Sequence, residues 1–272
     1  MFVNKHSKTS ADTGRDPSGR IWGKLPLTEW AVGNGGFFFH DDFLNFPKLS
    51  TSADTGKYAS YADTSDTITQ LATVIGGAAR LSIAATDNNE SWITTGGNTG
   101  VMCTIDDAAP QIVAFECRFQ KSSIADNALA FFVGLGEEAL AAANTLIDDT
   151  GEIASKDMIG FRCLHDNGEE LDFVYRIAGS AVQEKIANIQ ALVADTYIKL
   201  GFLYDPFTHP NSKKIKIFVD GLEQTTYVTQ ANIEAALFPA GEELALLFGA
   251  KVGAATARTA QLDWWRIAGS LP

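Results

Sequence analysis

The feature that most constrains the fold is a series of short segments in which apolar and polar side chains alternate. In IVAFECRFQ (112–120), every second residue from Val113 to Phe119 is apolar, whereas Glu116 and Arg118 point to the opposite face of an extended chain. Alternating or continuously apolar runs of strand length recur at 128–136, 157–165, 171–179, 197–205, 213–221, 243–251 and 261–269. Many such segments with turn residues between them predict an all-β sandwich.

Segments with a helical composition are few. The Ala-rich stretch EEALAAANTL (137–146) predicts a short surface helix within a long loop, and ANIEAAL (231–237) predicts a single helical turn. A chain of 272 residues is long for an average domain, but single β-sandwiches reach roughly 200–250 residues. We therefore expect one sandwich domain over residues 36–272.

Residues 1–35 lack the alternation found in the rest of the chain. Their apolar residues follow no sustained period of 2 or 3.6, which indicates an extended N-terminal arm rather than a domain. Large aromatic side chains on such an arm need a surface that buries them, either on this domain or on a neighbouring subunit. The residues of the arm that we predict to bind a partner are Arg15, Arg20, Trp22, Lys24, Leu25, Leu27 and Trp30.

The formal charge of −12 is unevenly distributed. Five basic and three acidic residues give the arm a net charge of +2, so the remainder carries −14. An acidic body repels phosphate, which argues against a nucleic-acid partner, whereas a basic arm suits an acidic protein surface. The sequence has no apolar run of about 18 residues, so it predicts no membrane-spanning helix.

The three cysteines, Cys103, Cys117 and Cys163, are odd in number and lack CxxC spacing. This pattern argues against a disulfide framework and against a zinc site. We expect reduced cysteines that pack as small apolar residues. The N-terminal residues also lack the apolar stretch of a secretory signal, so we expect synthesis in a reducing cytosol.

The strongest candidate for catalysis is EELDF (169–173). In a strand, Glu170 and Asp172 share one face, and paired carboxylates are what glycoside hydrolysis requires. Jelly-roll glucanases carry a third carboxylate two or three residues further on, where this chain has Val174 and Tyr175. We therefore predict no catalytic residue and interpret the pair as acidic side chains on a solvated face.

Metal-binding patterns are weak. His40, Asp41 and Asp42 are adjacent in GGFFFHDDF (35–43), but alternation along a strand separates the two aspartates. The four histidines are far apart in the sequence, without HxH or HxxxH spacing. Acidic turns at 148–152 and 166–170 carry oxygen ligands without EF-hand spacing, so calcium at the rim stays open and no cofactor is predicted.

The order of strand-end motifs resembles a known family. The Phe-rich DDF segment is followed by GGNTG (96–100), FECRFQ, FFVGLGEE, DMIGFR, VADTYIKLGFLYD, FVDG, LFPAGEELALLFG and LDWWRIA (263–269). This order is similar to that of concanavalin A-like (LamG-like) jelly-roll proteins among the virion structural proteins of tailed bacteriophages. The resemblance covers about residues 36–270 and leaves the arm outside it. It implies that the first and last strands lie side by side, with the Phe cluster beside Trp264 or Trp265.

The resemblance implies a non-enzymatic virion protein that decorates or cements the capsid exterior after synthesis in the host cytoplasm. Its expected partners are the major capsid protein or sister protomers, within a homo-oligomer. Two alternatives stay open. One is a carbohydrate-binding adhesin domain of a tail fibre or spike, which would need exposed aromatic residues beside Asn or Asp on one face. The other is a jelly-roll glycoside hydrolase. Fold alone does not decide among them.

Overall fold

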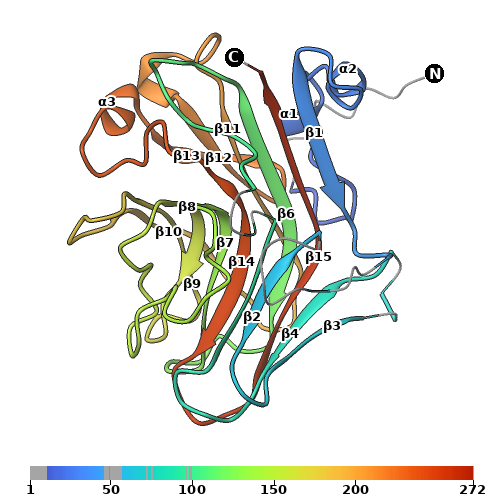
Figure 1. Cartoon of the computed structure of the whole chain (residues 1–272), viewed down its shortest axis with the longest axis vertical. Coiled ribbons are helices and arrows are strands. Elements are labelled where there is room, and N and C mark those ends of the chain that lie inside the picture. The colour runs from blue at the N-terminus through green and yellow to red at the C-terminus, as the bar shows by residue number, and fades with distance from the viewer. Residues whose placement is uncertain are drawn as a thin grey trace.

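The computed structural model describes residues 11–45, 49, 57–71, 73–74, 76–95, 97 and 100–271. The first ten residues of the predicted arm and most of the GGNTG segment lie outside these residues. Two antiparallel sheets stack face to face (Figure 1), which confirms the predicted all-β sandwich. Among the described residues, no helix has the length and apolar character needed to cross a membrane.

One sheet has eight strands in the order β13-β12-β11-β6-β15-β4-β3, and β1 also pairs with β15. These strands are β1 (Gly36–Asp41), β3 (Thr67–Gln70), β4 (Ala79–Ile83), β6 (Val113–Lys121), β11 (Ile198–Tyr204), β12 (Ile215–Val219), β13 (Leu222–Val228) and β15 (Arg258–Ser270).

The second sheet has seven strands in the order β10-β9-β8-β7-β14-β5-β2. These are β2 (Ala59–Ala62), β5 (Glu90–Thr94), β7 (Leu129–Gly136), β8 (Met158–Cys163), β9 (Glu170–Arg176), β10 (Glu184–Ala191) and β14 (Ala245–Val252). All eight segments predicted from periodicity contain a strand.

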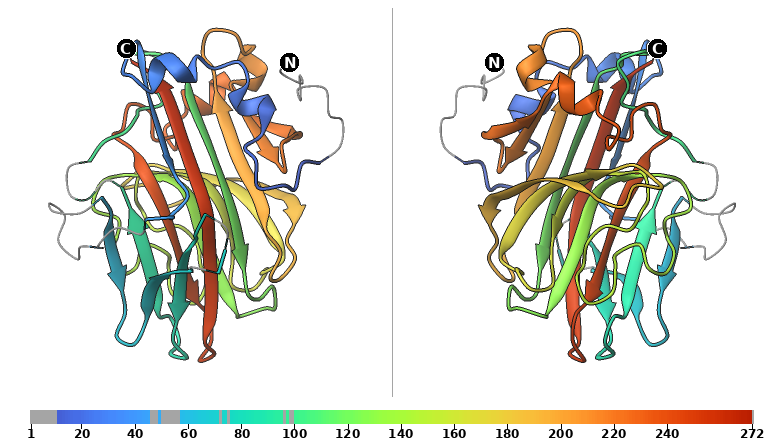
Figure 2. Two further views of the ribbon diagram at one scale, coloured as in Figure 1. Left: turned by 90° about the vertical axis from the view of Figure 1, so that its right-hand side faces the viewer. Right: turned by 90° about the vertical axis from the view of Figure 1, so that its left-hand side faces the viewer.

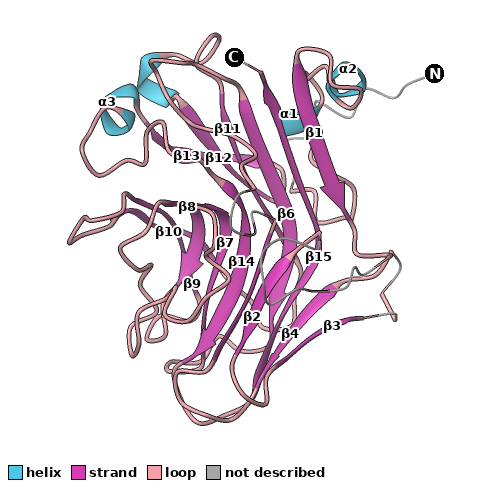
Figure 3. Ribbon diagram, viewed as in Figure 1, coloured by secondary structure: helices cyan, strands magenta, loops and turns pink. Residues whose placement is uncertain are grey.

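Over the residues that the structure describes, helical structure is confined to single turns: α1 (Gly19–Trp22), α2 (Leu27–Trp30), α3 (Gln230–Ile233) and a 3-10 turn, η2 (Asn211–Lys213) (Figure 3). The turn predicted within 231–237 is confirmed as α3. The helix predicted at 137–146 is wrong, because this segment is an irregular loop that packs on a sheet instead of facing solvent.

The core between the sheets follows the predicted alternation. Phe115 and Phe119 of β6 lie in it, whereas Glu116 and Arg118 project from the outer face of the eight-stranded sheet. Every second residue of β11 and β12 fills the same core, namely Ile198, Leu200, Phe202, Tyr204, Ile215, Ile217 and Val219. All three cysteines are buried and free.

The first and last strands pair as the resemblance implied. In the antiparallel ladder of β1 and β15, Phe38 lies opposite Ala268 and Asp41 lies opposite Trp265. Trp265 is buried between the sheets, whereas Trp264 lies on the outer face, which confirms that the two indoles point to opposite sides. The three consecutive phenylalanines lie opposite Ile267, Ala268 and Gly269, just past the tryptophans, and Phe43 is the ring that packs on Trp265.

Each sheet also has an outer face, and each outer face is partly covered by the chain itself. The segment between β7 and β8 (137–157) packs on the seven-stranded sheet, and we call it the covering loop. The arm, with α1 and α2, lies on the upper part of the eight-stranded sheet (Figure 2, left). These two covered faces are the regions where a binding site has to be sought.

Candidate functional site

The outer face of the seven-stranded sheet carries a second apolar cluster. Trp92, Phe132, Val174 and Leu247 project outward from four different strands and are fully buried. Aliphatic side chains of the covering loop pack on them, namely Leu140, Leu146 and Ile153. The aromatic residues that an exposed sugar-binding face would offer are therefore covered by the protein's own chain.

Glycines in the strands let these rings lie flat on the sheet. A Cβ at Gly249 in β14 would overlap the indole of Trp92, and one at Gly160 in β8 would lie 3.0 Å from the ring of Phe132. A glycine within a strand weakens the strand and marks a place where another group approaches the backbone closely. The sheet surface is thus shaped to receive its own aromatic residues beneath the loop.

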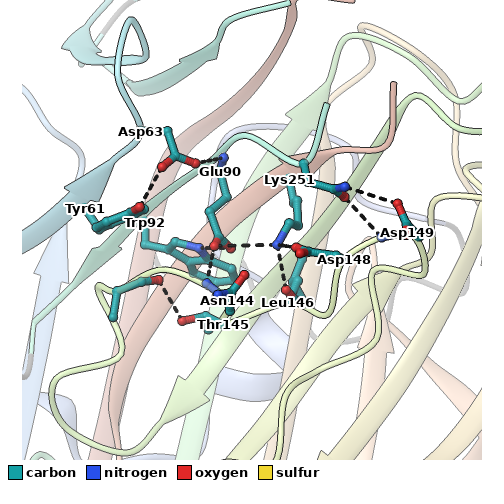
Figure 4. A network of polar contacts seen from close by, with 12 residues as sticks. Tyr61, Asp63, Glu90, Trp92, Asn144, Thr145, Leu146, Asp148, Asp149 and Lys251 are labelled. Carbon is teal, nitrogen blue, oxygen red and sulfur yellow. Dashed lines mark hydrogen bonds and ion pairs between the residues drawn. The ribbon is translucent and has the colours of Figure 1, made fainter. Parts of the chain in front are cut away.

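A buried carboxylate links this cluster to the covering loop. Glu90 of β5 accepts a hydrogen bond from Trp92 Nε1 at 2.9 Å through one oxygen and one from the backbone N–H of Asn144 through the other (Figure 4). Its own backbone N–H donates to Asp63 at 2.9 Å, and Asp63 also accepts from the Tyr61 hydroxyl at 2.6 Å. Both carboxylate oxygens of Glu90 are therefore occupied.

Lys251 of β14 completes the network. Its fully buried Nζ lies 3.6 Å from Glu90, donates to the carbonyl of Leu146 at 2.9 Å and forms an ion pair with Asp148 (Figure 4). Burial raises the pKa of Glu90, whereas the nearby Lys251 ammonium lowers it. Burial outweighs the Lys251 charge, so the pKa of Glu90 stays above its ordinary value, and the contacts of both groups hold the loop on the sheet.

A second buried ion pair lies on the same face. Arg162 of β8 donates from Nη2 to Asp172 of β9 at 2.7 Å, and the other oxygen of Asp172 accepts from the backbone N–H of Asn188 at 3.0 Å. Within the described residues, Nε and Nη1 of Arg162 find no hydrogen-bond acceptor. The pair joins β8 and β9 to the point in β10, between Ile186 and Gln190, where the register of the β9–β10 ladder shifts.

This geometry corrects one sequence-based interpretation. Glu170 and Asp172 do lie on the same face of β9, but only Glu170 is partly solvated, because Asp172 is 4% exposed and is bound to Arg162. The two positions where a third carboxylate was sought, Val174 and Tyr175, are buried apolar positions of the two clusters. The strand therefore presents no free pair of carboxylates.

The first and last residues of the covering loop, which we call its neck, are a carboxylate pair that sequence reasoning missed. Glu137 accepts a hydrogen bond from the backbone N–H of Asp157 at 3.0 Å and pairs with Lys156 at 3.0 Å. Asp157 accepts from the backbone N–H of Ala178 at 2.7 Å. Burial raises the pKa of Asp157 to about 6, and the hydrogen bond with Glu137 and the charges of Glu137 and Glu242 act in the same direction. This pair closes the loop at its two ends.

The histidine and aspartates of the opening strand are separated, as alternation predicted. Asp41 faces inward and accepts from Lys57 Nζ at 2.6 Å and from the hydroxyl of Tyr58. His40 is exposed on the other face, opposite Arg266. Among the described residues, no group of three or more metal-ligating side chains comes together. In the acidic turn 148–152, Asp148 binds Lys251 and Asp149 binds Asn88.

The sequence left open whether the tryptophans of the arm are buried by this domain or by a neighbouring subunit. In the structure, this domain itself buries them. Trp22 and Trp30 are each 5% exposed and pack with Phe218, Ala268 and other residues of the eight-stranded sheet. Leu25 and Leu27 are partly buried at the margin of this cluster, Arg20 is half-buried, and Lys24 is exposed. Contact of the arm residues with a partner stays a prediction.

Polar contacts also hold the arm on the sheet. Glu116 of β6 accepts from the backbone N–H of Ser18 at 3.0 Å, from the Ser18 hydroxyl, and from Trp22 Nε1 at 2.6 Å. Arg15 donates from Nε to Asp263 at 3.0 Å, and Arg118 donates to the same carboxylate at 2.6 Å. The predicted partner residue Arg15 therefore already has an acidic partner within the chain.

The comparisons with known proteins support the fold. No protein-family model matches the sequence, and no curated protein matches it. Peanut lectin aligns with a TM-score of 0.56 at 13% identity, over 87% of this chain and 98% of the lectin. A GH16 protein of the mixed-linkage glucan locus of Bacteroides ovatus aligns with a TM-score of 0.52 at 12% identity, over 84% and 99%.

A protein of unknown function from Shewanella oneidensis MR-1 aligns with a TM-score of 0.54 at 16% identity, over 87% of each chain. All of these identities are low, so the similarities define the class by fold alone. The chain is a concanavalin A-like jelly-roll β-sandwich, a fold shared by lectins and glycoside hydrolases.

Proposed function

We propose that this protein is a non-enzymatic structural protein of a tailed-phage virion. It decorates the capsid exterior as a homo-oligomer and contacts the major capsid protein or sister protomers. The observation that carries the non-enzymatic part is the closed outer face of the seven-stranded sheet. Its aromatic residues lie under the covering loop, and its carboxylates at Glu90 and Asp172 are bound by Lys251 and Arg162.

The virion assignment rests on the resemblance in the order of strand-end motifs. Two further features support it. The body carries a charge of −14, which keeps it soluble and away from packaged nucleic acid. The arm binds a protein surface through aromatic and charged side chains, which is the chemistry that a cementing contact uses.

Electron microscopy of the parent particle tests this proposal. A labelled chain is expected at many copies over the head, and label confined to the tail would contradict capsid decoration. A chain lacking residues 1–35 should remain folded and fail to join the particle, because the arm is expected to make the contact. Normal incorporation of the truncated chain would remove the arm from the mechanism.

Carbohydrate binding is the second candidate function, because similar folds include peanut lectin. A glycan array separates the two: the decoration function predicts no specific signal from the intact protein. Hydrolysis of a panel of β-glucans, with Glu170→Gln as the control, tests the glycoside hydrolase. Activity that is lost in this variant would overturn the non-enzymatic assignment.

A further inference from the structure

The eight-stranded sheet carries a groove that fits the arm closely. Gly201 in the middle of β11 has no side chain, and a Cβ there would lie 2.6 Å from the Cδ1 of Ile21. A Cβ at Gly221 would lie 2.9 Å from the Ser18 hydroxyl, and one at Gly76 would overlap the Arg15 guanidinium. Gly221 and Gly76 are turn residues whose positive φ already favours glycine, whereas Gly201 lies within a strand, where glycine is costly unless another segment needs the space. The sheet is therefore shaped as a receptor for these side chains.

The groove also matches the polar groups of the arm. Glu116 lies at its centre, buried, and takes three donors from Ser18 and Trp22. Lys199, also buried, donates to the carbonyl of Asp16 at 2.8 Å and lies 3.6 Å from Asp12. Buried charges whose side-chain hydrogen bonds run to arm groups suit the groove to this segment.

The arm is a separate unit from the body that it covers. Its apolar residues form a cluster with outer-face side chains such as Phe218 and do not enter the core between the sheets. The connection to β1 runs through the exposed residues 31–35, where Gly33 and Gly35 have φ of 77° and 73° and nothing within 4 Å of a Cβ. The backbone N–H groups of residues 32–34 bond to α2, and the carbonyl of Gly35 accepts from Leu271, so a change of direction of the arm falls between these two sets of bonds, at the glycines.

We propose that the groove around Glu116 accepts the arm of a second copy of this chain, so that neighbouring subunits exchange arms. The contacts of Glu116 and Lys199 with the arm would form equally well between two copies of the chain. The arm, with its net positive charge, is attracted to the acidic body of any copy. This exchange rests on the proposed function, in which many subunits lie close together on the surface of a virion. It names the sister protomer as the arm's partner and the outer face of the eight-stranded sheet as its binding site.

A disulfide at the edge of the groove tests this exchange. The Cβ of Asp12 lies 3.7 Å from the Cβ position of Gly221, which is within the range of disulfides. The native cysteines are buried, so they should not compete. Full-length Asp12→Cys and Gly221→Cys chains carrying different tags are purified reduced, mixed, concentrated and then oxidised.

The matched control replaces Gly221→Cys by Gly179→Cys. Both glycines have left-handed backbones, with φ of 71° and 81°, but Gly179 lies in the β9–β10 connection of the other sheet with nothing within 4 Å. We expect the Asp12–Gly221 pair to give about tenfold or more interchain disulfide than the control pair, because exchange raises the effective concentration of the two sulfurs. Equal yields for both pairs would overturn exchange.

The double variant Asp12→Cys/Gly221→Cys provides the second measurement, in solution and on purified particles. Exchange predicts covalent oligomers, and closure only within single chains in both settings would overturn it. If the protein is on the particle but its disulfides are all intrachain, exchange fails while capsid decoration stands. If interchain disulfides form in solution but the protein is absent from the particle, capsid decoration fails while exchange stands.

Discussion

The two outer faces of the sandwich are covered in different ways. On the seven-stranded sheet, the covering loop is joined to strands at both ends and is held by aliphatic packing and by the buried Glu90–Lys251 pair. On the eight-stranded sheet, the arm is joined to a strand at one end only and is held by tryptophans and by the Glu116 acceptor. The covering loop is part of the folded body, whereas the arm, in the proposed exchange, binds the body as a ligand would.

This difference determines what each cover can do. Releasing the loop would expose Trp92 and Phe132 and leave buried charges without partners, so the loop should open only when the body unfolds. Releasing the arm exposes Phe218 and leaves Glu116 and Lys199 without their arm partners, but it leaves the core between the sheets intact. One outer face is thus closed by a segment fixed at both ends, and the other is covered by the segment for which we propose exchange.

The largest expected effect comes from breaking the loop's ion pair. Lys251→Met leaves Glu90 buried without its compensating cation, which should lower the free energy of unfolding by about 3–5 kcal/mol. Urea denaturation followed by tryptophan fluorescence measures this loss. The double variant Glu90→Gln/Lys251→Met should recover much of it, and a double variant as unstable as the single one would contradict the role of the charge.

The next effect concerns the arm. Trp22→Ala removes the largest apolar contact of α1 and the donor to Glu116, and should weaken arm docking by about 3 kcal/mol. Because the arm is separate from the core, the global unfolding transition should stay nearly unchanged. Limited proteolysis should cut the arm of this variant much faster than that of the wild type. A large fall in global stability would contradict a separable arm.

The neck of the covering loop should make stability depend on pH. The pKa of Asp157 is raised to about 6 from an ordinary 3.8, so the native state binds this proton more tightly than the unfolded state. Its stabilising contribution is complete below about pH 4 and is lost as the pH rises through 6. Asp157→Asn, which stays neutral, should stabilise the protein at pH 7 by about 1–2 kcal/mol. Unfolding curves at pH 4 and pH 7 measure both effects, and a variant with unchanged pH dependence would exclude Asp157 as their source.

The smallest effect is expected at the solvent-accessible end of the arm. Arg15→Gln removes one of two guanidinium partners of Asp263, and because Arg118 remains, arm docking should weaken by only about 0.5–1 kcal/mol. Lys24→Gln, at an exposed position of the same arm, serves as the control and should change nothing. Hydrogen exchange of the α1 amides measures both, and equal effects of the two variants would indicate a general charge effect instead of the Asp263 contact.

Alternating and continuously apolar runs were sufficient to predict the fold class and eight strands. Two strands show where this signal fails. β10 is mostly exposed and reads EKIANIQA without a period of two, whereas β5 reads ESWIT and is too short and too polar to form an apolar run. The helix expected at 137–146 follows from alanine content, but packing of Leu140 and Leu146 on the sheet overrides that preference.

The closed face was not predictable from the same pattern. Alternation indicates which side of a strand Arg162 or Asp172 occupies, but it does not indicate whether that side is covered by another segment. Glu90 and Lys251 are 161 positions apart, and each is a single charge in an apolar strand, so nothing local marks them as partners. A charged residue in an otherwise apolar strand was the one signal available, and for Asp172 the sequence-based interpretation was a solvated face.

The pairing of β1 with β15 has a practical consequence for fusion proteins. Leu271 donates its backbone N–H to the carbonyl of Gly35 at 3.0 Å, so the body's first and last described residues lie at the same end as α1 and α2 (Figure 1). A cargo joined after residue 271 would therefore emerge beside the arm and compete for the same space. The connection from β14 to β15 (253–257), which passes from one sheet to the other, lies at the far end of the molecule (Figure 2), and it is the better insertion point for peptide display.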